Sequence, residues 1–241
     1  MSVKKHDTIT AQAAEISEIF VSIQGEGLYC GQKQVFLRFA GCNLKCVYCD
    51  EPAALKKAAA VKMSAGAAAE KVIRLARKSR VKTVSITGGE PLLNREFIKA
   101  LAPVLEKAGL AVHLETNGTL YRELEGVKGL ADVIAMDIKL PSSTGGRAFW
   151  AEHAKFLAVA PGKTFVKTVV TSRTSVAEFR KAVNIVARAG KAIPFFIQPV
   201  TAKGGARPLS LAKLDVLYRL AAASLDDLRI LPQLHKLWGI K

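Results

Sequence analysis

The chain has 241 residues, of which 50% are hydrophobic and 23% charged, a balance that suits one compact domain over residues 1–241. No stretch approaches the about 18 apolar residues of a membrane span. Residues 1–14 lack the apolar core of a secretion signal, so we expect a flexible N-terminal extension there. Four cysteines, three of them clustered, argue against a disulfide framework and predict a protein of the reducing cytoplasm.

The formal net charge of +16 raises the question of nucleic-acid binding. Much of the excess lies between Pro52 and Lys82, where nine Lys or Arg residues accompany one acidic residue. In the helix expected there, Lys71, Arg74 and Lys78 share one face, opposite an apolar face. We therefore interpret the charge as the solvated side of an amphipathic helix. Anionic substrates, an acidic electron donor and RNA remain open as its partners.

Taken in chain order, apolar and β-branched runs predict strands, and segments with a 3.6-residue period predict helices. The predicted strands cover residues 16–23, 35–40, 82–87, 110–115, 132–137, 164–170, 194–198 and 228–231. The predicted helices cover residues 64–79, 94–108, 175–189 and 211–223, with Ser64 as an N-cap and Gly190 as a C-terminal stop. This alternation is typical of parallel βαβ units and predicts an α/β fold, an open, partial parallel β/α barrel of about six units.

Polar residues follow most of the predicted strands. In parallel α/β folds, ligands bind beyond the carboxyl ends of the strands, so we expect these endings to surround one polar cavity. The endings are Gln24-Gly25-Glu26, the cysteine loop, Gly88-Gly89-Glu90, Glu115-Thr116-Asn117, Asp137-Ile138-Lys139, Gln198-Pro199, and Gln233 with His235. Arg38, inside an apolar strand, is expected to face an anion in this cavity, with a structural salt bridge as the alternative.

Three cysteines stand in a C-x3-C-x2-C spacing, Cys42, Cys46 and Cys49, with Tyr48 before the last. Three thiolates can hold a [4Fe–4S] cluster and leave one iron open for a ligand that is not protein. A tetrahedral zinc site is the alternative, with Cys30 as the fourth ligand, and buried or disulfide-bonded thiols are a third interpretation.

The cysteine spacing and its aromatic residue resemble the cluster loop of the radical S-adenosylmethionine (SAM) enzymes. Gly88-Gly89-Glu90-Pro91 resembles the GGEP element of the same enzymes. The resemblance implies a [4Fe–4S] cluster on the three cysteines and a SAM molecule that is cleaved to a 5′-deoxyadenosyl radical. The residues that it implies as SAM contacts are Tyr48, Cys49, Asp50, Gly88, Gly89, Glu90, Glu115, Asn117, Asp137 and Lys139.

The flanking segments narrow the resemblance to the 7-carboxy-7-deazaguanine synthase family. They are Phe20 to Gly27, Phe36 to Leu44, Thr87, Ile197-Gln198-Pro199 and Leu231 to Lys236. The implied reaction, in queuosine and 7-deazapurine biosynthesis, converts 6-carboxy-5,6,7,8-tetrahydropterin to 7-carboxy-7-deazaguanine with loss of ammonia. The resemblance also implies Mg²⁺, a reductant such as flavodoxin or ferredoxin, and a homodimer.

The same resemblance assigns the substrate pocket. The residues that it implies as substrate contacts are Ile23, Gln24, Gly25, Glu26, Arg38, Thr87, Gln198 and His235. Arg38 is expected to bind the substrate carboxylate, a geometry that suits a guanidinium. His235 and the last residues are expected to close over the substrate, and His235 is the candidate for a proton transfer.

Two positions depart from the family pattern. Glu51 stands where the family has a threonine that binds Mg²⁺, and a carboxylate can keep that role. Asp137-Ile138-Lys139 stands where the family usually has Ser-Pro-Lys, a pattern closer to the glycyl-radical activating enzymes. An activating enzyme is therefore the alternative function. A basic metal-binding RNA module is a third reading, which leaves the glycine-rich strand ends unexplained.

Overall fold

The computed structural model describes residues 12–55, 58, 60–202 and 205–240. Its strands form one sheet in the order β3-β1-β2-β4-β5-β6-β7-β8-β9, which does not close on itself within the described residues. The strands are β1 (Ala13–Ile23), β2 (Lys33–Phe39), β3 (Val61–Ser64), β4 (Thr83–Gly88), β5 (Ala111–Thr116), β6 (Val133–Asp137), β7 (Thr164–Val170), β8 (Phe195–Pro199) and β9 (Leu228–Ile230). The predicted open α/β barrel is thereby confirmed.

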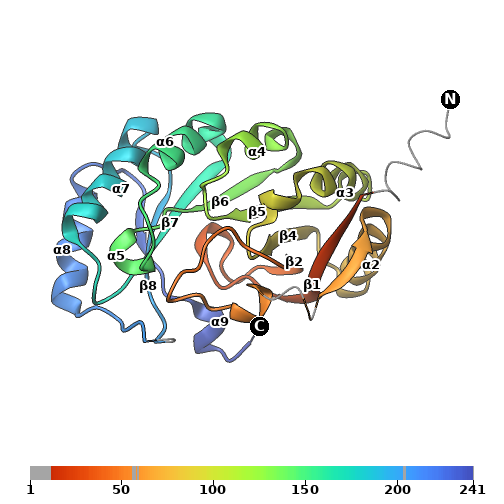
Figure 1. Cartoon of the computed structure of the whole chain (residues 1–241), viewed down its shortest axis with the longest axis horizontal. Coiled ribbons are helices and arrows are strands. Elements are labelled where there is room, and N and C mark those ends of the chain that lie inside the picture. Colours follow the sequence, from red (N-terminus) through yellow and green to blue (C-terminus); the bar gives the residue numbers. More distant parts are fainter. Residues whose placement is uncertain (1–11, 56–57, 59, 203–204, 241) are drawn as a thin grey trace.

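Helices cover the convex side of this curved sheet, as Figure 1 shows. They are α2 (Ala65–Ser79), α3 (Arg95–Lys107), α4 (Tyr121–Glu125), α6 (Trp150–Val159), α7 (Val176–Ala189) and α8 (Leu211–Ala222). The short helices α5 (Pro141–Thr144) and α9 (Leu234–Leu237) lie instead beside the loop after β2 (Figure 1). Ser64 and Ser175 cap α2 and α7 with their side chains, because each hydroxyl accepts a hydrogen bond from a backbone N–H in the first turn. None of the described helices is long and apolar enough to cross a bilayer.

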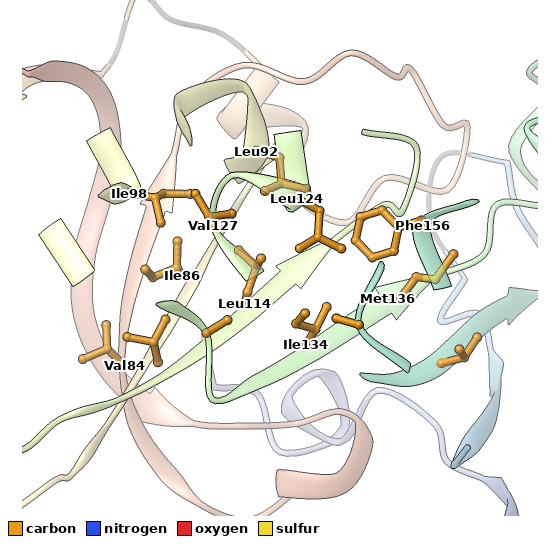
Figure 2. Packing of buried hydrophobic residues seen from close by; sticks show 14 of the residues in the cluster. Val84, Ile86, Leu92, Ile98, Leu114, Leu124, Val127, Ile134, Met136 and Phe156 are labelled. Carbon is orange, nitrogen blue, oxygen red and sulfur yellow. The ribbon is translucent and has the colours of Figure 1, made fainter. Parts of the chain in front are cut away.

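The main core lies between the sheet and these helices. Side chains of β4, β5 and β6 meet those of α3, α4 and α6 there (Figure 2). The labelled members of this layer are Val84, Ile86, Leu92, Ile98, Leu114, Leu124, Val127, Ile134, Met136 and Phe156. Helix α2 joins it through Ala68, Val72 and Ala76, and Arg74 and Lys78 are exposed on the other side, as the amphipathic pattern predicts.

Three expectations from the sequence differ from the structure. Strand β3 and helix α6 were not predicted, because four residues are too short for a clear alternation and α6 has a weakly amphipathic sequence. The expected extension over residues 1–14 is too long, since Ala13 and Ala14 belong to β1, and residues 1–11 lie outside the described residues.

The third difference concerns β1, which runs antiparallel to β2 and pairs Ile23 with Lys33. Its carboxyl end therefore lies at the opposite edge of the sheet from the end of β2. The loop that follows crosses the concave face: Leu28 packs with Phe165 and Phe196, and the Tyr29 ring lies 5.4 Å from that of His113. This loop, residues 24–32, closes the amino-terminal end of the open barrel, and we call it the plug loop.

Candidate active site

One cavity opens on the concave face at the carboxyl ends of the parallel strands. Inward side chains along these strands change from apolar near the plug loop, as at Ala135, Phe165 and Phe196, to polar at the carboxyl ends. The polar and charged residues that line the cavity from the parallel strands include Arg38, Thr87, Glu115, Asp137, Lys167 and Gln198. The strand ends therefore converge as predicted. Gln24, Gly25 and Glu26 also line the cavity, although they reach it from the plug loop and not from the carboxyl edge.

The three clustered cysteines lie in the loop after β2 and line this cavity. The backbone fixes the loop at several points: Gly41 N donates to Ala54 O at 2.7 Å, and Cys49 N donates to Cys46 O at 3.0 Å. Burial raises the pKa of each of the three thiols, so the thiolates need a positively charged partner, which a metal centre supplies. Leu44 N donates to Cys42 Sγ at 3.4 Å, a contact typical of a metal-bound thiolate.

The geometry of the thiols discriminates between the two metal interpretations. A zinc ion with Zn–S bonds of about 2.3 Å would place its sulfur ligands about 3.8 Å apart. Among the described residues, no three cysteine sulfurs lie within 4.8 Å of one another. Cys30 follows the 3-10 turn of the plug loop and does not line the cavity with the other three. The cysteines are therefore not gathered as ligands of a single zinc ion in this structure, and Cys42, Cys46 and Cys49, without Cys30, line the cavity.

Gly88 ends β4 and packs against Phe39, and Gly89 follows it and packs directly against the cysteine loop. A Cβ atom on Gly89 would lie 2.0 Å from Gly41 O and 2.9 Å from Cys42 Cβ. Gly88 has a φ of +140°, a value that L side chains rarely adopt. Gly89 N donates to Phe39 O at 3.2 Å, and both glycines line the cavity. The glycines are thus needed for the close approach of two backbone segments, whatever ligand they contact.

Glu90 does not line the cavity and is fully buried behind it. Its carboxylate accepts hydrogen bonds from Leu92 N at 3.0 Å, Thr116 Oγ1 at 2.8 Å and Asn117 N at 2.8 Å. Burial raises the pKa of the Glu90 carboxyl to about 7, against the effect of these hydrogen bonds. The Glu90 side chain thus points away from the cavity, and its predicted contact with SAM stays a prediction. The side chain joins the ends of β4 and β5.

Asn117 connects β5 to the cysteine loop through a closed ring of hydrogen bonds. Its Nδ2 donates to Asn43 Oδ1 at 2.8 Å, Asn43 Nδ2 donates to Thr119 Oγ1 at 2.9 Å, and Thr119 Oγ1 donates to Asn117 Oδ1 at 2.6 Å. Asn117 Nδ2 also lies 3.9 Å from Cys42 Sγ. This ring ties the first cysteine to the neighbouring strand end.

Lys139 occupies the other side of the cysteine loop. Its Nζ donates to Asp137 Oδ2 at 2.7 Å and lies 5.3 Å from the centre of the Tyr48 ring. Burial alone would lower the pKa of this ammonium, but the Asp137 carboxylate raises it well above its usual value. Lys139 therefore stays charged beside the cysteines. Tyr48, Asp137 and Lys139 all line the cavity, so their predicted SAM contacts remain open to test.

Glu115 was predicted to contact SAM, yet its hydrogen bonds run to predicted substrate residues. Its Oε1 accepts from Gln24 Nε2 at 2.8 Å and from Ser85 Oγ at 2.6 Å, and its Oε2 accepts from Thr87 Oγ1 at 3.3 Å. Burial alone would raise the pKa of the Glu115 carboxyl, but neighbouring His113 and Lys167 and these hydrogen bonds lower it on balance. An ionised Glu115 thus orients the amide of Gln24 and the hydroxyl of Thr87.

Arg38 lies on β2 next to Thr87 of β4, because these two residues are register partners. Its Nε lies 3.0 Å from Glu18 Oε1, and its Nη1 lies 3.8 Å from Glu51 Oε1. Both interpretations of Arg38 therefore apply: the guanidinium is anchored by a structural ion pair with Glu18 and still lines the cavity.

The C-terminal segment lies across the cavity beside the plug loop. Leu234 N donates to Gly25 O at 3.1 Å, and a Cβ on Gly25 would lie 2.6 Å from His235 N. Gln233 Nε2 donates to Glu26 Oε1 at 2.9 Å, and His235 Nε2 lies 3.7 Å from Asp50 Oδ2. Burial would raise the pKa of the Asp50 carboxyl, but His235, Lys236 and Lys167 lower it on balance.

Two residues that line the cavity received no role from the sequence. Lys167, on β7 beside Asp137, forms a partly buried ion pair with Glu26, and Gln233 donates to the same carboxylate. Burial alone would lower the pKa of Lys167, but Glu26 and Asp137 raise it above its usual value. Lys167, like Arg38, is a single cation in an apolar strand. The same sequence pattern could therefore have identified it as a cavity residue. Cys42, Glu51 and all of the predicted substrate residues line the cavity.

Comparisons with known proteins agree with this geometry. The model of the Radical SAM superfamily matches residues 37–200. The 7-carboxy-7-deazaguanine synthase of Geobacter sulfurreducens is 37% identical over 94% of this chain and 97% of its own length. That of Methanopyrus kandleri is 33% identical over 92% of each chain.

Among solved structures, QueE from Escherichia coli superimposes with a TM-score of 0.68 over 97% of this chain and 99% of its own, at 20% identity. A radical SAM methyltransferase from Sphaerobacter thermophilus follows with a TM-score of 0.60 over 89% of this chain and 77% of its own, at 14% identity. These two likenesses concern the fold. The family model and the two synthases, matched along nearly the whole chain, confirm the resemblance: the chain belongs to the radical SAM superfamily and, within it, to the 7-carboxy-7-deazaguanine synthase family.

Proposed function

We propose that the protein converts 6-carboxy-5,6,7,8-tetrahydropterin to 7-carboxy-7-deazaguanine with loss of ammonia. The observation that carries this proposal is that one cavity is lined by two sets of residues with different chemistry. Cys42, Cys46 and Cys49 line it, and so do the polar residues Gln24, Thr87 and Arg38. Cys42, Cys46 and Cys49 would hold a [4Fe–4S] cluster, which with SAM would supply radical chemistry to the substrate.

Gln24, Thr87 and Arg38 present polar groups that suit a carboxylated pterin. Glu115 holds Gln24 and Thr87 in place, so their polar groups are preorganised for the ring edge. Arg38, anchored by Glu18, presents a guanidinium that can bind the substrate carboxylate bidentately. His235, beside Asp50, is the candidate for moving a proton.

Glu51 fits a role as a Mg²⁺ ligand. Its carboxylate lies 3.8 Å from Arg38 Nη1, so a substrate carboxylate bound to Arg38 would lie beside a second negative charge. Mg²⁺ prefers oxygen ligands, and carboxylates above all. In our proposal Glu51 would hold the ion, whose charge would offset that of the carboxylates.

The covered cavity favours this reaction over the activating-enzyme alternative. An enzyme that acts on a protein backbone needs an open groove for that backbone. Here Gln233 and His235 lie across the cavity and contact the plug loop and Asp50. We further propose that the protein works in the cytoplasm as a homodimer with a low-potential protein reductant. Sedimentation of the anaerobic protein tests the dimer.

The decisive test is turnover by the anaerobically reconstituted protein. With dithionite, SAM, Mg²⁺ and carboxytetrahydropterin, we expect 7-carboxy-7-deazaguanine and ammonia, measured by mass spectrometry and an ammonia assay. Arg38→Gln should raise the KM for the pterin and leave cluster content unchanged. SAM cleavage without any deazaguanine product would contradict the proposal.

A further inference from the structure

We infer that His153, a buried residue of α6, is a positioning residue for the SAM side of the cavity. It does not line the cavity, and its place in the fold was not foreseen, because α6 itself was not predicted. The inference rests on membership of the radical SAM superfamily. It does not depend on the identity of the substrate.

Both ring nitrogens of His153 bind backbone atoms of two different strand ends. Nε2 accepts a hydrogen bond from Lys139 N at 3.2 Å, after β6, and Nδ1 lies 3.0 Å from Gly118 O, after β5. Because one partner is an N–H donor and the other a carbonyl acceptor, only the neutral tautomer with the proton on Nδ1 satisfies both. The ring is completely buried, so water does not replace either partner.

The electrostatic surroundings agree with a neutral ring. Burial, with a smaller effect of the nearby Lys139 ammonium, lowers the pKa of His153 to about 4, against the opposing effects of the Gly118 carbonyl and Glu152. A protonated ring would turn a second N–H toward the N–H of Lys139. The two hydrogen bonds are therefore intact throughout the neutral pH range.

Each strand end that His153 binds goes on to contact the cysteine loop. On one side, Gly118 lies between Asn117 and Thr119, the two members of the hydrogen-bonded ring that includes Asn43. On the other side, Lys139 lies over the ring of Tyr48. His153 thus fixes the spacing of two loops that hold the cysteine loop at residues 43 and 48. A change at His153 is transmitted to both.

Gly118 shows how closely this region is packed. It has a φ of +68°, and a Cβ there would lie 2.7 Å from Met136 Cε and 3.2 Å from His153 Nδ1. The imidazole therefore sits against the turn with no space for a second conformation of its partner. This close packing is what a residue that sets a loop position requires.

The test compares three variants of the reconstituted holoprotein. His153→Phe keeps an aromatic ring and loses both hydrogen bonds. His153→Gln keeps one donor and one acceptor on its amide. His113→Phe is the matched control, because His113 is as deeply buried but neither ring nitrogen has a hydrogen-bond partner among the described residues.

We expect His153→Phe to weaken SAM binding by about tenfold or more, as is usual when a residue that orients a metal or cofactor site is lost. Equilibrium binding of SAM and the change that SAM produces in the electron paramagnetic resonance spectrum of the reduced cluster measure this effect without turnover. His153→Gln should recover most of the affinity, and His113→Phe should stay within twofold of the wild type.

Unchanged SAM affinity and spectrum in His153→Phe would overturn the inference, even if the variant were less stable. Equal weakening in His113→Phe would do the same, since the loss would then follow from any change in a buried histidine. If His153→Phe does not fold, His153→Gln and His153→Asn provide the test, because the two amide side chains differ in length. A SAM affinity equal to that of the wild type in both variants would refute a positioning role. Because none of these measurements needs the pterin, a failure of the proposed reaction would leave them interpretable.

Discussion

Replacement of Glu90 by Gln tests the account of the buried carboxylate behind the cavity. Glu90 has a pKa of about 7 in the folded protein because burial outweighs three hydrogen bonds. In an unfolded chain the pKa of a glutamate is about 4.3. Between these two values the folded protein binds one proton more than the unfolded chain. The free energy of unfolding must therefore decrease as the pH rises through this interval.

The size of this effect follows from the two pKa values. One pKa unit corresponds to about 1.4 kcal/mol, so the Glu90 carboxyl should lower the free energy of unfolding by about 2 kcal/mol between pH 5.5 and pH 8. Glu90→Gln has no such proton and loses this slope. The amide also turns an N–H₂ group toward one of the three donors, which costs about 1–3 kcal/mol at acidic pH. The difference between the two proteins should therefore shrink as the pH rises.

The assay is anaerobic guanidinium unfolding of both proteins at several pH values between 5.5 and 8. Glu96→Gln is the matched control, because Glu96 lies nearby in the first turn of α3 with half of its side chain exposed. The free energy of unfolding of Glu96→Gln should change with pH in the same way as that of the wild type. A constant or growing difference between the wild type and Glu90→Gln would show that Glu90 is ionised throughout. The three hydrogen bonds would then outweigh burial, and the reasoning would be refuted.

Three further predictions follow from the site. Gly89→Ala should lower the iron content after reconstitution and destabilise the protein by about 1–3 kcal/mol, because its Cβ would overlap the cysteine-loop backbone. The control Gly129→Ala should change neither the iron content nor the stability, because a Cβ there meets no atom within 4 Å. Cys46→Ala should lose the cluster absorbance and SAM cleavage, whereas Cys30→Ala should keep both. Loss of iron in Cys30→Ala as well would make Cys30 a fourth ligand and leave no open iron for SAM. Lys167→Met should lower the free energy of unfolding by about 1–3 kcal/mol in chemical unfolding and raise the KM for the pterin, since it leaves a partly buried carboxylate without its cation while Gln198 and Gln233 still donate to it. A stability equal to that of the wild type would mean that water reaches that carboxylate.

Local patterns were sufficient for most of the fold and for the chemistry. The predicted helix 64–79 is α2 with Ser64 as its N-cap, and the predicted strand 164–170 is β7, because caps and β-branched runs act over a few residues. The cysteine spacing likewise lies within one loop, so it could be read directly from the sequence. The convergence of the strand ends followed from the parallel βαβ alternation.

The direction of β1 and the partners of the buried charges could not be read in this way. The plug loop enters the concave face because β1 is antiparallel, and the contact of Leu28 with Phe165 joins residues far apart in the chain. Glu115 and Glu90 were both expected to contact SAM. In the structure Glu115 accepts a hydrogen bond from Gln24, and Glu90 accepts one from Thr116. The partner that a buried carboxylate finds depends on which other polar groups the fold also removes from water.

The sequence by itself therefore determined the α/β class, the cluster loop and the family, since each is encoded in short segments. The tertiary structure alone decided which carboxylates face the cavity, which are buried behind it, and that His153 joins two strand ends. The physical reason is that a buried polar group must find a partner in three dimensions, and the cost of leaving it unpaired selects contacts that have no period and no spacing along the chain.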